Sequence, residues 1–243
     1  MCNFQKAYIS TFFNNYEKTI DLNVTYIYYI ILLVTTRRRD FHEKVEPIKD
    51  QKVIKNIRAI LKAQSLRNEL LFVLGINIGL RISDILKFKM EDLIKANGKT
   101  AKDYVTIQEV KTSKTKKFYM GDIVKRTIEA YIKETPGIIP DDYVFKSRKG
   151  NNIPITRQQA YRILNNAAEH LGIVERNSKG IIVSGEIGTH TMRKTFGYHA
   201  YKNGVSLELL MDIFNHSTPS MTLRYIGITE HQKQQVYLQS NLG

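Results

Sequence analysis

The chain has 243 residues, which is enough for one sizeable domain with at most a small appendage. Its formal net charge of +14 favours a polyanionic partner, and the basic residues are spread along the whole chain, which favours nucleic acid over a membrane. The single cysteine, Cys2, excludes an intrachain disulfide and a cysteine-based zinc site, and it fits a reducing compartment. We therefore expect a cytoplasmic protein that acts on nucleic acid.

The N-terminal residues differ in composition from the remainder of the chain. Residues 1–44 are aromatic, Asn-rich and weakly periodic, and they predict an extension of undefined structure ahead of a domain at residues 45–243. Their apolar run, residues 24–34, is shorter than the roughly 20 residues needed to span a bilayer. Arg37-Arg38-Arg39 follows this run, so contact with a membrane surface is the weaker alternative; we expect no membrane partner.

The domain begins with helical patterns. Apolar residues at helical spacing predict a helix over residues 50–64, and a nearly all-apolar stretch predicts a buried helix over residues 66–78, which Gly79 ends. Arg81 is predicted to open a third helix. Its predicted core face consists of Ile82, Ile85, Leu86 and Leu93.

A β-hairpin is predicted after Gly98. Two β-like runs, residues 104–110 and 117–120, flank a polar stretch at residues 111–116 that is typical of a hairpin tip. The following segments are predicted as a helix at 122–133, a loop with Pro136 and Pro140, and an extended piece at 143–145.

The second half of the domain predicts helices with clear start and stop signals. Thr156 and Gln159 form a capping-box pattern for a helix that runs to Leu171. Further helices are predicted between Gly188 and Gly204, from Ser206 to Phe214, from Thr218-Pro219 onward, and in the tail from Thr229, whose apolar residues are Val236, Tyr237, Leu238 and Leu242. The pattern predicts an α+β domain that is mainly helical with one small antiparallel sheet.

A few polar residues of this domain have the chemistry needed to cleave a phosphodiester. Arg81 and Arg193 can each donate two hydrogen bonds to a phosphate and stay charged. His190 lies three residues before Arg193, so a helix would place both on one face. Tyr225 could attack the phosphorus, but its phenol, with an ordinary pKa of about 10, needs nearby cations or a base.

Each of these residues also has an ordinary explanation. A tyrosine on a helix usually packs, a lone His-x-x-Arg pair is a weak signal, and Arg81 could lie on the surface. The hairpin lysines could form a solvated face. The combination of order and spacing is what favours a shared site.

From residue 45 onward the chain resembles the catalytic domain of the tyrosine recombinase, or phage integrase, family. The segment Gly79-Leu80-Arg81-Ile82-Ser83-Asp84 resembles the family's first arginine box, and Lys111-Thr112-Ser113-Lys114 resembles its lysine hairpin. Thr189-His190-Thr191-Met192-Arg193 resembles the His-x-x-Arg box, and Phe214-Asn215-His216-Ser217 resembles the Leu-Gly-His box. Tyr225 follows His216 at the family's nine-residue interval.

The resemblance implies a mechanism and assigns each residue a role. Arg81, Arg193 and His216 would hold the scissile phosphate while Tyr225 attacks it and His190 assists proton transfer at the tyrosine. Lys111, or Lys114 if the hairpin tip aligns differently, would protonate the leaving 5′ oxygen. Asp84 would orient the arginines, and we expect Lys114, Lys116, Lys117 and Arg224 to contact DNA.

The resemblance also implies partners. We expect double-stranded DNA and a homo-oligomer on DNA, tetrameric in the synapse and monomeric in solution, whose subunits are joined by the tail from Thr229. We expect no cofactor and no metal, because the chain has no Asp, Glu, His or Cys cluster at metal-ligand spacing.

Two departures from the family pattern affect the expected function. Phe214-Asn215 replaces the usual Leu-Gly, but asparagine tolerates left-handed backbone geometry, so we expect the turn to be retained. Residues 1–44 are too few for the family's N-terminal core-binding domain. A site-specific recombinase is the leading interpretation; the alternatives are a DNA-binding regulator without recombination activity and a DNA-relaxing enzyme of the type IB topoisomerase kind.

Overall fold

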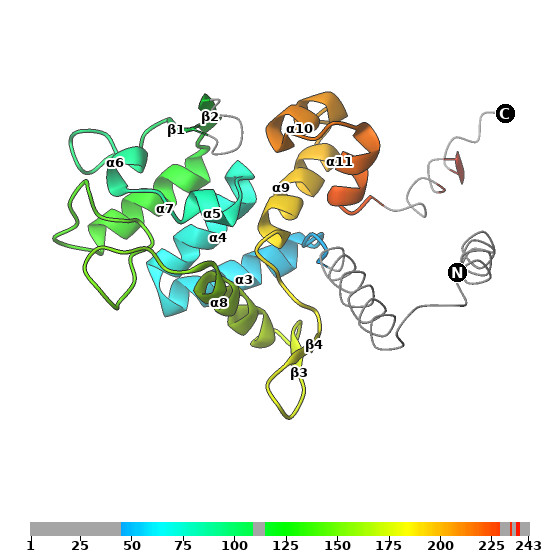
Figure 1. Cartoon of the computed structure of the whole chain (residues 1–243), viewed down its shortest axis with the longest axis horizontal. Helices are drawn as coiled ribbons and strands as arrows, with labels where there is room; N and C mark the ends of the chain where they lie inside the picture. Colours follow the sequence, from blue (N-terminus) through cyan, green and yellow to red (C-terminus); the bar gives the residue numbers. More distant parts are fainter. Residues whose placement is uncertain (1–44, 109–114, 229–233, 235–236, 239–243) are drawn as a thin grey trace, which may run out of the picture. The chain divides into compact units, whose positions relative to one another are not determined.

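The computed structural model describes residues 45–108 and 115–228, together with residues 234, 237 and 238 (Figure 1). The elements are α3 (Gln51–Gln64), α4 (Leu66–Ile78), α5 (Ile82–Ile85), α6 (Met90–Leu93), β1 (Tyr104–Gln108), β2 (Thr115–Tyr119), α7 (Asp122–Lys133), α8 (Arg157–Glu169), β3 (Glu175–Arg176), β4 (Ile182–Ser184), α9 (Thr191–Lys202), α10 (Leu207–Phe214) and α11 (Pro219–Tyr225). The prediction of a mainly helical α+β domain with small antiparallel sheets is confirmed.

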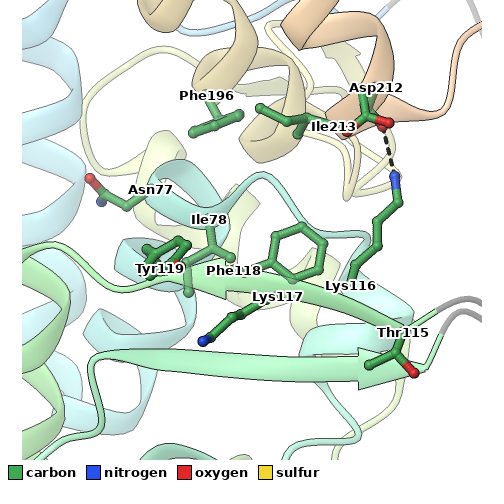
Figure 2. Close-up of a pocket in the computed structure, with 10 residues that line it drawn as sticks. All are labelled: Asn77, Ile78, Thr115, Lys116, Lys117, Phe118, Tyr119, Phe196, Asp212 and Ile213. Carbon is green, nitrogen blue, oxygen red and sulfur yellow. Dashed lines mark hydrogen bonds between the residues drawn. The ribbon is translucent and has the colours of Figure 1, made fainter.

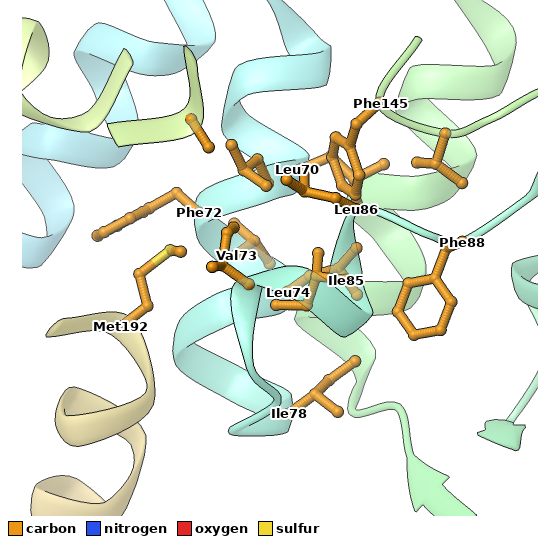
Figure 3. Packing of buried hydrophobic residues seen from close by; sticks show 14 of the residues in the cluster. Leu70, Phe72, Val73, Leu74, Ile78, Ile85, Leu86, Phe88, Phe145 and Met192 are labelled. Atoms are coloured by element: carbon orange, nitrogen blue, oxygen red, sulfur yellow. The ribbon is translucent and has the colours of Figure 1, made fainter. Parts of the chain in front are cut away.

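Helix α4 is the centre of the larger hydrophobic core. Its residues from Glu69 to Gly75 are all buried, and it contacts α3, α7 and α9. Figure 3 shows Phe72 and Val73 of α4 on the side of Met192 of α9, and these three residues belong to one cluster of buried residues. Gly75 lets α9 approach closely, because a Cβ atom there would lie 2.9 Å from Cβ of Met192.

A second, smaller core joins α9, α10 and the end of α11. Tyr198 of α9, Leu210 and Phe214 of α10, and Ile226 after α11 are buried together. Helix α9 therefore belongs to both cores, since its N-terminal end packs on α4 and its C-terminal end packs on α10 and the end of α11.

Two helices end in left-handed residues that redirect the chain. Helix α4 ends at Gly79, with φ 69° and ψ 21°, and helix α10 ends at Asn215, with φ 56° and ψ 49°. The expectation that Asn215 preserves the turn is confirmed. Each cap is followed within two residues by a predicted site residue, Arg81 in the first case and His216 in the second.

The prediction of one helix from Arg81 to Leu93 is wrong. The segment forms α5 and α6, with an extended stretch between them that pairs with a distant part of the chain. Phe88 accepts a hydrogen bond from the amide of Val144 at 2.9 Å, and the amide of Met90 donates to Asp142 O at 2.9 Å. These tertiary hydrogen bonds override a helical pattern that the residue spacing alone supports.

The predicted lysine hairpin is present, but its second strand begins two residues earlier than predicted. Strands β1 and β2 pair antiparallel from Tyr104 opposite Tyr119 to Gln108 opposite Thr115. Thr115 and Lys116, predicted in the tip, belong to the strand. Lys111 and Lys114 lie outside the described residues.

Other predicted elements match closely. The predicted helices at residues 50–64, 66–78 and 122–133 are α3, α4 and α7; α8 ends two residues before Leu171. The small hairpin of β3 and β4 was not predicted, because strands of two and three residues carry too little pattern. The extension at residues 1–44 and most of the tail lie outside the described residues, and no helix within the described part could cross a membrane.

The left-handed cap at Gly79 provides a test of the fold. We expect Gly79→Ala to lower the free energy of unfolding by about 2–4 kcal/mol, because a Cβ atom is disfavoured at positive φ and would also clash with a neighbouring ring. That ring belongs to Phe196, whose Cε1 would lie 2.7 Å from the added Cβ atom. Urea unfolding measures the change.

The matched control is Gly98→Ala. Gly98 has nearly the same φ, 67°, but no atom lies within 4 Å of an added Cβ. Gly98→Ala should lower the free energy of unfolding by only the penalty for a Cβ atom at positive φ, about 1–2 kcal/mol. Equal losses for both variants would mean that the contact with Phe196 does not constrain this turn.

Candidate active site

Arg193 is a buried arginine held by main-chain oxygens. It lies in the first turn of α9 and is 5% exposed, and its two terminal nitrogens donate to Gly79 O and, at 3.1 Å, to Phe214 O. The guanidinium lies 4.6 Å from the ring centroid of Phe214. Both acceptors lie at helix C-termini, where the partial negative charge of the helix dipole favours a cation. Arg193 therefore joins the ends of α4 and α10.

Arg81 and Asp84 are in the electrostatic environment of Arg193. Burial lowers the pKa of Arg193, the charge of Arg81 lowers it further, and Tyr225 and Asp84 raise it. Arg81 is partly buried at the N-cap of α5, and Asp84 lies within that helix. The negative charge of the Asp84 carboxylate offsets part of the repulsion between Arg81 and Arg193.

His216 follows the left-handed cap of α10 and contacts the helix that carries Tyr225. Its Nδ1 lies 3.1 Å from Oγ1 of Thr222, which is fully buried in α11. Burial lowers the pKa of His216, and the charges of Arg193 and Arg81 lower it further. Both effects favour the neutral imidazole, which contacts Thr222 through Nδ1.

Tyr225 ends α11 with its hydroxyl beside His190. The Oη atom lies 3.4 Å from Nδ1 of His190, and the ring packs at 5.0 Å from the His216 ring. Burial raises the pKa of Tyr225, while Arg193 and Arg81 act in the opposite direction. His190 is exposed and is the N-cap of α9, so it lies at the start of the helix that carries Arg193 rather than within it.

Phe214 is a central contact that the sequence analysis treated only as a departure from the family pattern. Its ring centroid lies 5.3 Å from those of His216 and Tyr225 and 6.2 Å from that of Phe196. Gly197 makes room for it, because a Cβ atom there would lie 2.6 Å from the Phe214 ring. Thr222 and Phe214 were both missed, and the only signal for Phe214 was its place beside the Asn-His pair.

Of the predicted DNA-contacting residues, Lys116 and Lys117 lie on the described part of the hairpin. Lys116 Nζ donates to Asp212 O of α10 at 2.7 Å, across a hollow of about 430 Å³ that Phe118 and Ile213 also line (Figure 2). Lys117 Nζ lies 3.5 Å from the ring centroid of Tyr104. Arg224 is exposed on α11.

The structure therefore brings Arg81, Asp84, His190, Arg193, His216 and Tyr225 together. Within the described residues, no group of His, Cys, Asp and Glu could hold a metal ion.

Comparison with known proteins identifies the group to which the chain belongs. The sequence model of the phage integrase family matches residues 48–232. A protein of Bacillus subtilis named probable integrase/recombinase YoeC is 39% identical over 193 residues, which cover 79% of this chain and 95% of that protein. The chain belongs to the phage integrase family. The tyrosine recombinase XerD of Listeria innocua is 27% identical over 72% of this chain.

The lengths of the relatives differ. The match covers 54% of the Listeria XerD, so this chain spans about half the length of that recombinase but nearly all of YoeC. Among solved structures, the XerA recombinase matches with a TM-score of 0.61 and 14% identity over 82% of this chain and 65% of XerA. The XerH recombinase matches with a TM-score of 0.56 and 15% identity over 77% of this chain and 51% of XerH. These structures share the tyrosine recombinase catalytic fold.

The titration of His216 tests the arrangement of this integrase-family site. We expect His216 to titrate below the ordinary value of 6.5, because burial and two arginine charges disfavour the imidazolium. Proton–carbon NMR of the histidine rings across pH 4–9 measures this, with His216→Gln to assign the resonance. The ring should stay neutral at a pH where an exposed histidine is half protonated; a midpoint at or above 6.5 would contradict the arrangement.

Proposed function

We propose that this chain cleaves and rejoins DNA strands at specific sites through a 3′-phosphotyrosyl bond to Tyr225. The observation that supports this most strongly is the placement of the Tyr225 hydroxyl beside His190, within the field of Arg81 and Arg193. Family membership and the names of its relatives, integrases and tyrosine recombinases, support the same reaction. The XerH recombinase was crystallised as a post-cleavage complex with its palindromic difH substrate, which supports DNA as the substrate.

The reaction exchanges one phosphodiester for another. Arg81 and Arg193 donate to the nonbridging oxygens, which stabilises the charge that develops there. Arg193 does so through N–H groups other than the two that bind Gly79 O and Phe214 O. A bond forms between Tyr225 Oη and phosphorus, and the bond from phosphorus to the 5′ oxygen breaks. His190 accepts the phenol proton, and Lys111 or Lys114 supplies a proton to the departing 5′ oxygen. A 5′ hydroxyl from a partner strand then reverses these steps, with no net change in phosphoester bonds.

The raised pKa of Tyr225 fits this sequence of events. A phenol whose pKa lies above its ordinary value of 10 is protonated at neutral pH, so the free protein does not present an ionised nucleophile. The proton must leave as the attack occurs, and His190 is the neighbouring group at 3.4 Å that can accept it.

A DNA-binding regulator and a DNA-relaxing enzyme are the competing functions. A single assay on a nicked duplex that carries the target site distinguishes the three. A recombinase gives a covalent adduct and strand exchange, a relaxing enzyme gives the adduct without exchange, and a regulator gives binding alone.

The nucleophile itself is tested by Tyr225→Phe. On a suicide substrate, in which the released strand diffuses away, the natural protein should form a covalent adduct that denaturing gels resolve. The variant should form none, because it lacks the attacking oxygen, while its affinity for DNA stays within about twofold. An undiminished adduct in the variant would assign the nucleophile to another residue.

We also propose that the protein assembles on DNA through its C-terminal tail. Tyr237 and Leu238 are 82% and 64% exposed, so their apolar surface is available to a second subunit. Tyr237→Ser combined with Leu238→Ser should weaken higher-order complexes on a two-site DNA and leave single-site binding intact, as gel-shift titration would measure. Assembly that is unchanged in the double variant would argue that these residues do not join subunits.

A further inference from the structure

Residues 45–49, which precede α3, lie along the helix that carries Arg193. Ile48 donates its amide to Oγ1 of Thr195 at 2.9 Å, and Ile48 O accepts from Nε2 of His199 at 3.0 Å. Lys194 Nζ donates to Val45 O at 2.6 Å. Three side chains of α9 therefore bind the main chain of this segment, which we call the N-terminal strap.

The strap also contacts the chain just beyond Tyr225. Lys49 Nζ donates to Gly227 O at 3.0 Å. A Cβ atom on Gly227 would lie 2.8 Å from Cδ of Pro47 and 2.9 Å from Oε2 of Glu46, so the strap lies directly on the backbone that follows α11. The strap thereby holds α9 and the end of α11 together.

Lys194 links the strap to Tyr225 itself. Its Nζ, bound to Val45 O, lies 5.4 Å from the ring centroid of Tyr225. The residue is only 8% exposed, although lysine is among the residues least often buried. The preceding residue, Arg193, also acts on this tyrosine, since its positive charge lowers the pKa of Tyr225.

We propose that the N-terminal strap is a positioning element for Tyr225, so that its hydrogen bonds to α9 set the distance between the phenol and the phosphate held by Arg193. This inference depends on the proposed function, in which Tyr225 is the nucleophile. Helix α11 has only seven residues, too few to be stable alone, so its orientation depends on such external contacts. A displacement of about 1 Å from attack geometry can lower a rate on the order of 100-fold.

A purely structural role predicts different behaviour. If the strap only stabilises the fold, then loss of one of its hydrogen bonds lowers the free energy of unfolding and leaves the cleavage rate of the folded protein unchanged. If it positions Tyr225, the cleavage step slows while DNA affinity stays the same.

Thr195→Val tests this, because it keeps the shape of the side chain and removes the acceptor for the Ile48 amide. Thr127→Val is the matched control. Like Thr195, Thr127 is buried in a helix, and its hydroxyl donates to the carbonyl four residues earlier at 2.7 Å. Thr127 lies in α7, however, away from the strap. Single-turnover adduct formation on saturating suicide substrate gives the rate, filter binding gives the affinity, and thermal unfolding shows that each variant is folded at the assay temperature.

The expected result is a rate about tenfold lower or more for Thr195→Val, with affinity within about twofold, and no change of rate for Thr127→Val. Equal rates for both variants would overturn the proposal. If Thr195→Val does not fold, Lys49→Met removes the bond to Gly227 from a side chain that is 38% exposed, and the same pattern is expected. An adduct that persists in Tyr225→Phe would instead refute the proposed function, so the two failures are distinguishable.

Discussion

The site depends on one buried cation that is bound by two peptide carbonyls. Arg193 has almost no access to water, and such a charge is costly unless its donors are paired. The carbonyls of Gly79 and Phe214 supply that pairing and lie at the C-termini of two different helices. Because one guanidinium contacts both, the first arginine segment and the His216 segment are held in a fixed relation to α9.

The C-terminal ends of α4 and α10 have the same arrangement. In each, a left-handed residue stops the helix, a carbonyl at the helix end accepts from Arg193, and the chain turns so that a candidate phosphate-binding residue follows. Tyr225 is then added by a short helix that packs on Phe214 and contacts His216 through Thr222. The smaller hydrophobic core is therefore also the support of the site, because the partly buried Tyr225 packs against it.

Local signals predicted much of this arrangement. Thr218-Pro219 indicated the start of α11, Ser206 indicated the start of α10, and the tolerance of asparagine for positive φ indicated the turn at Asn215. The break between α5 and α6 could not be predicted, because it arises from pairing with residues about 55 positions away. The hydrogen-bond partners of Arg193 could not be predicted either, because every residue has a main-chain carbonyl and only the fold determines which two lie within reach. The catalytic roles of Lys111 and Lys114 remain predictions.

The pairing of Arg193 with carbonyls has a consequence for how this protein can diverge. Neither position 79 nor position 214 contributes a side-chain atom to those hydrogen bonds. The residue types allowed at these positions are therefore limited by backbone shape and ring packing rather than by polar chemistry. Phe214 and Asn215 stand where the family pattern described above has leucine and glycine, and this chain still has a left-handed turn at Asn215 and a main-chain oxygen of Phe214 that accepts from Arg193. A search for distant members of the family by residue identity at positions 214 and 215 would therefore miss proteins that keep the same turn.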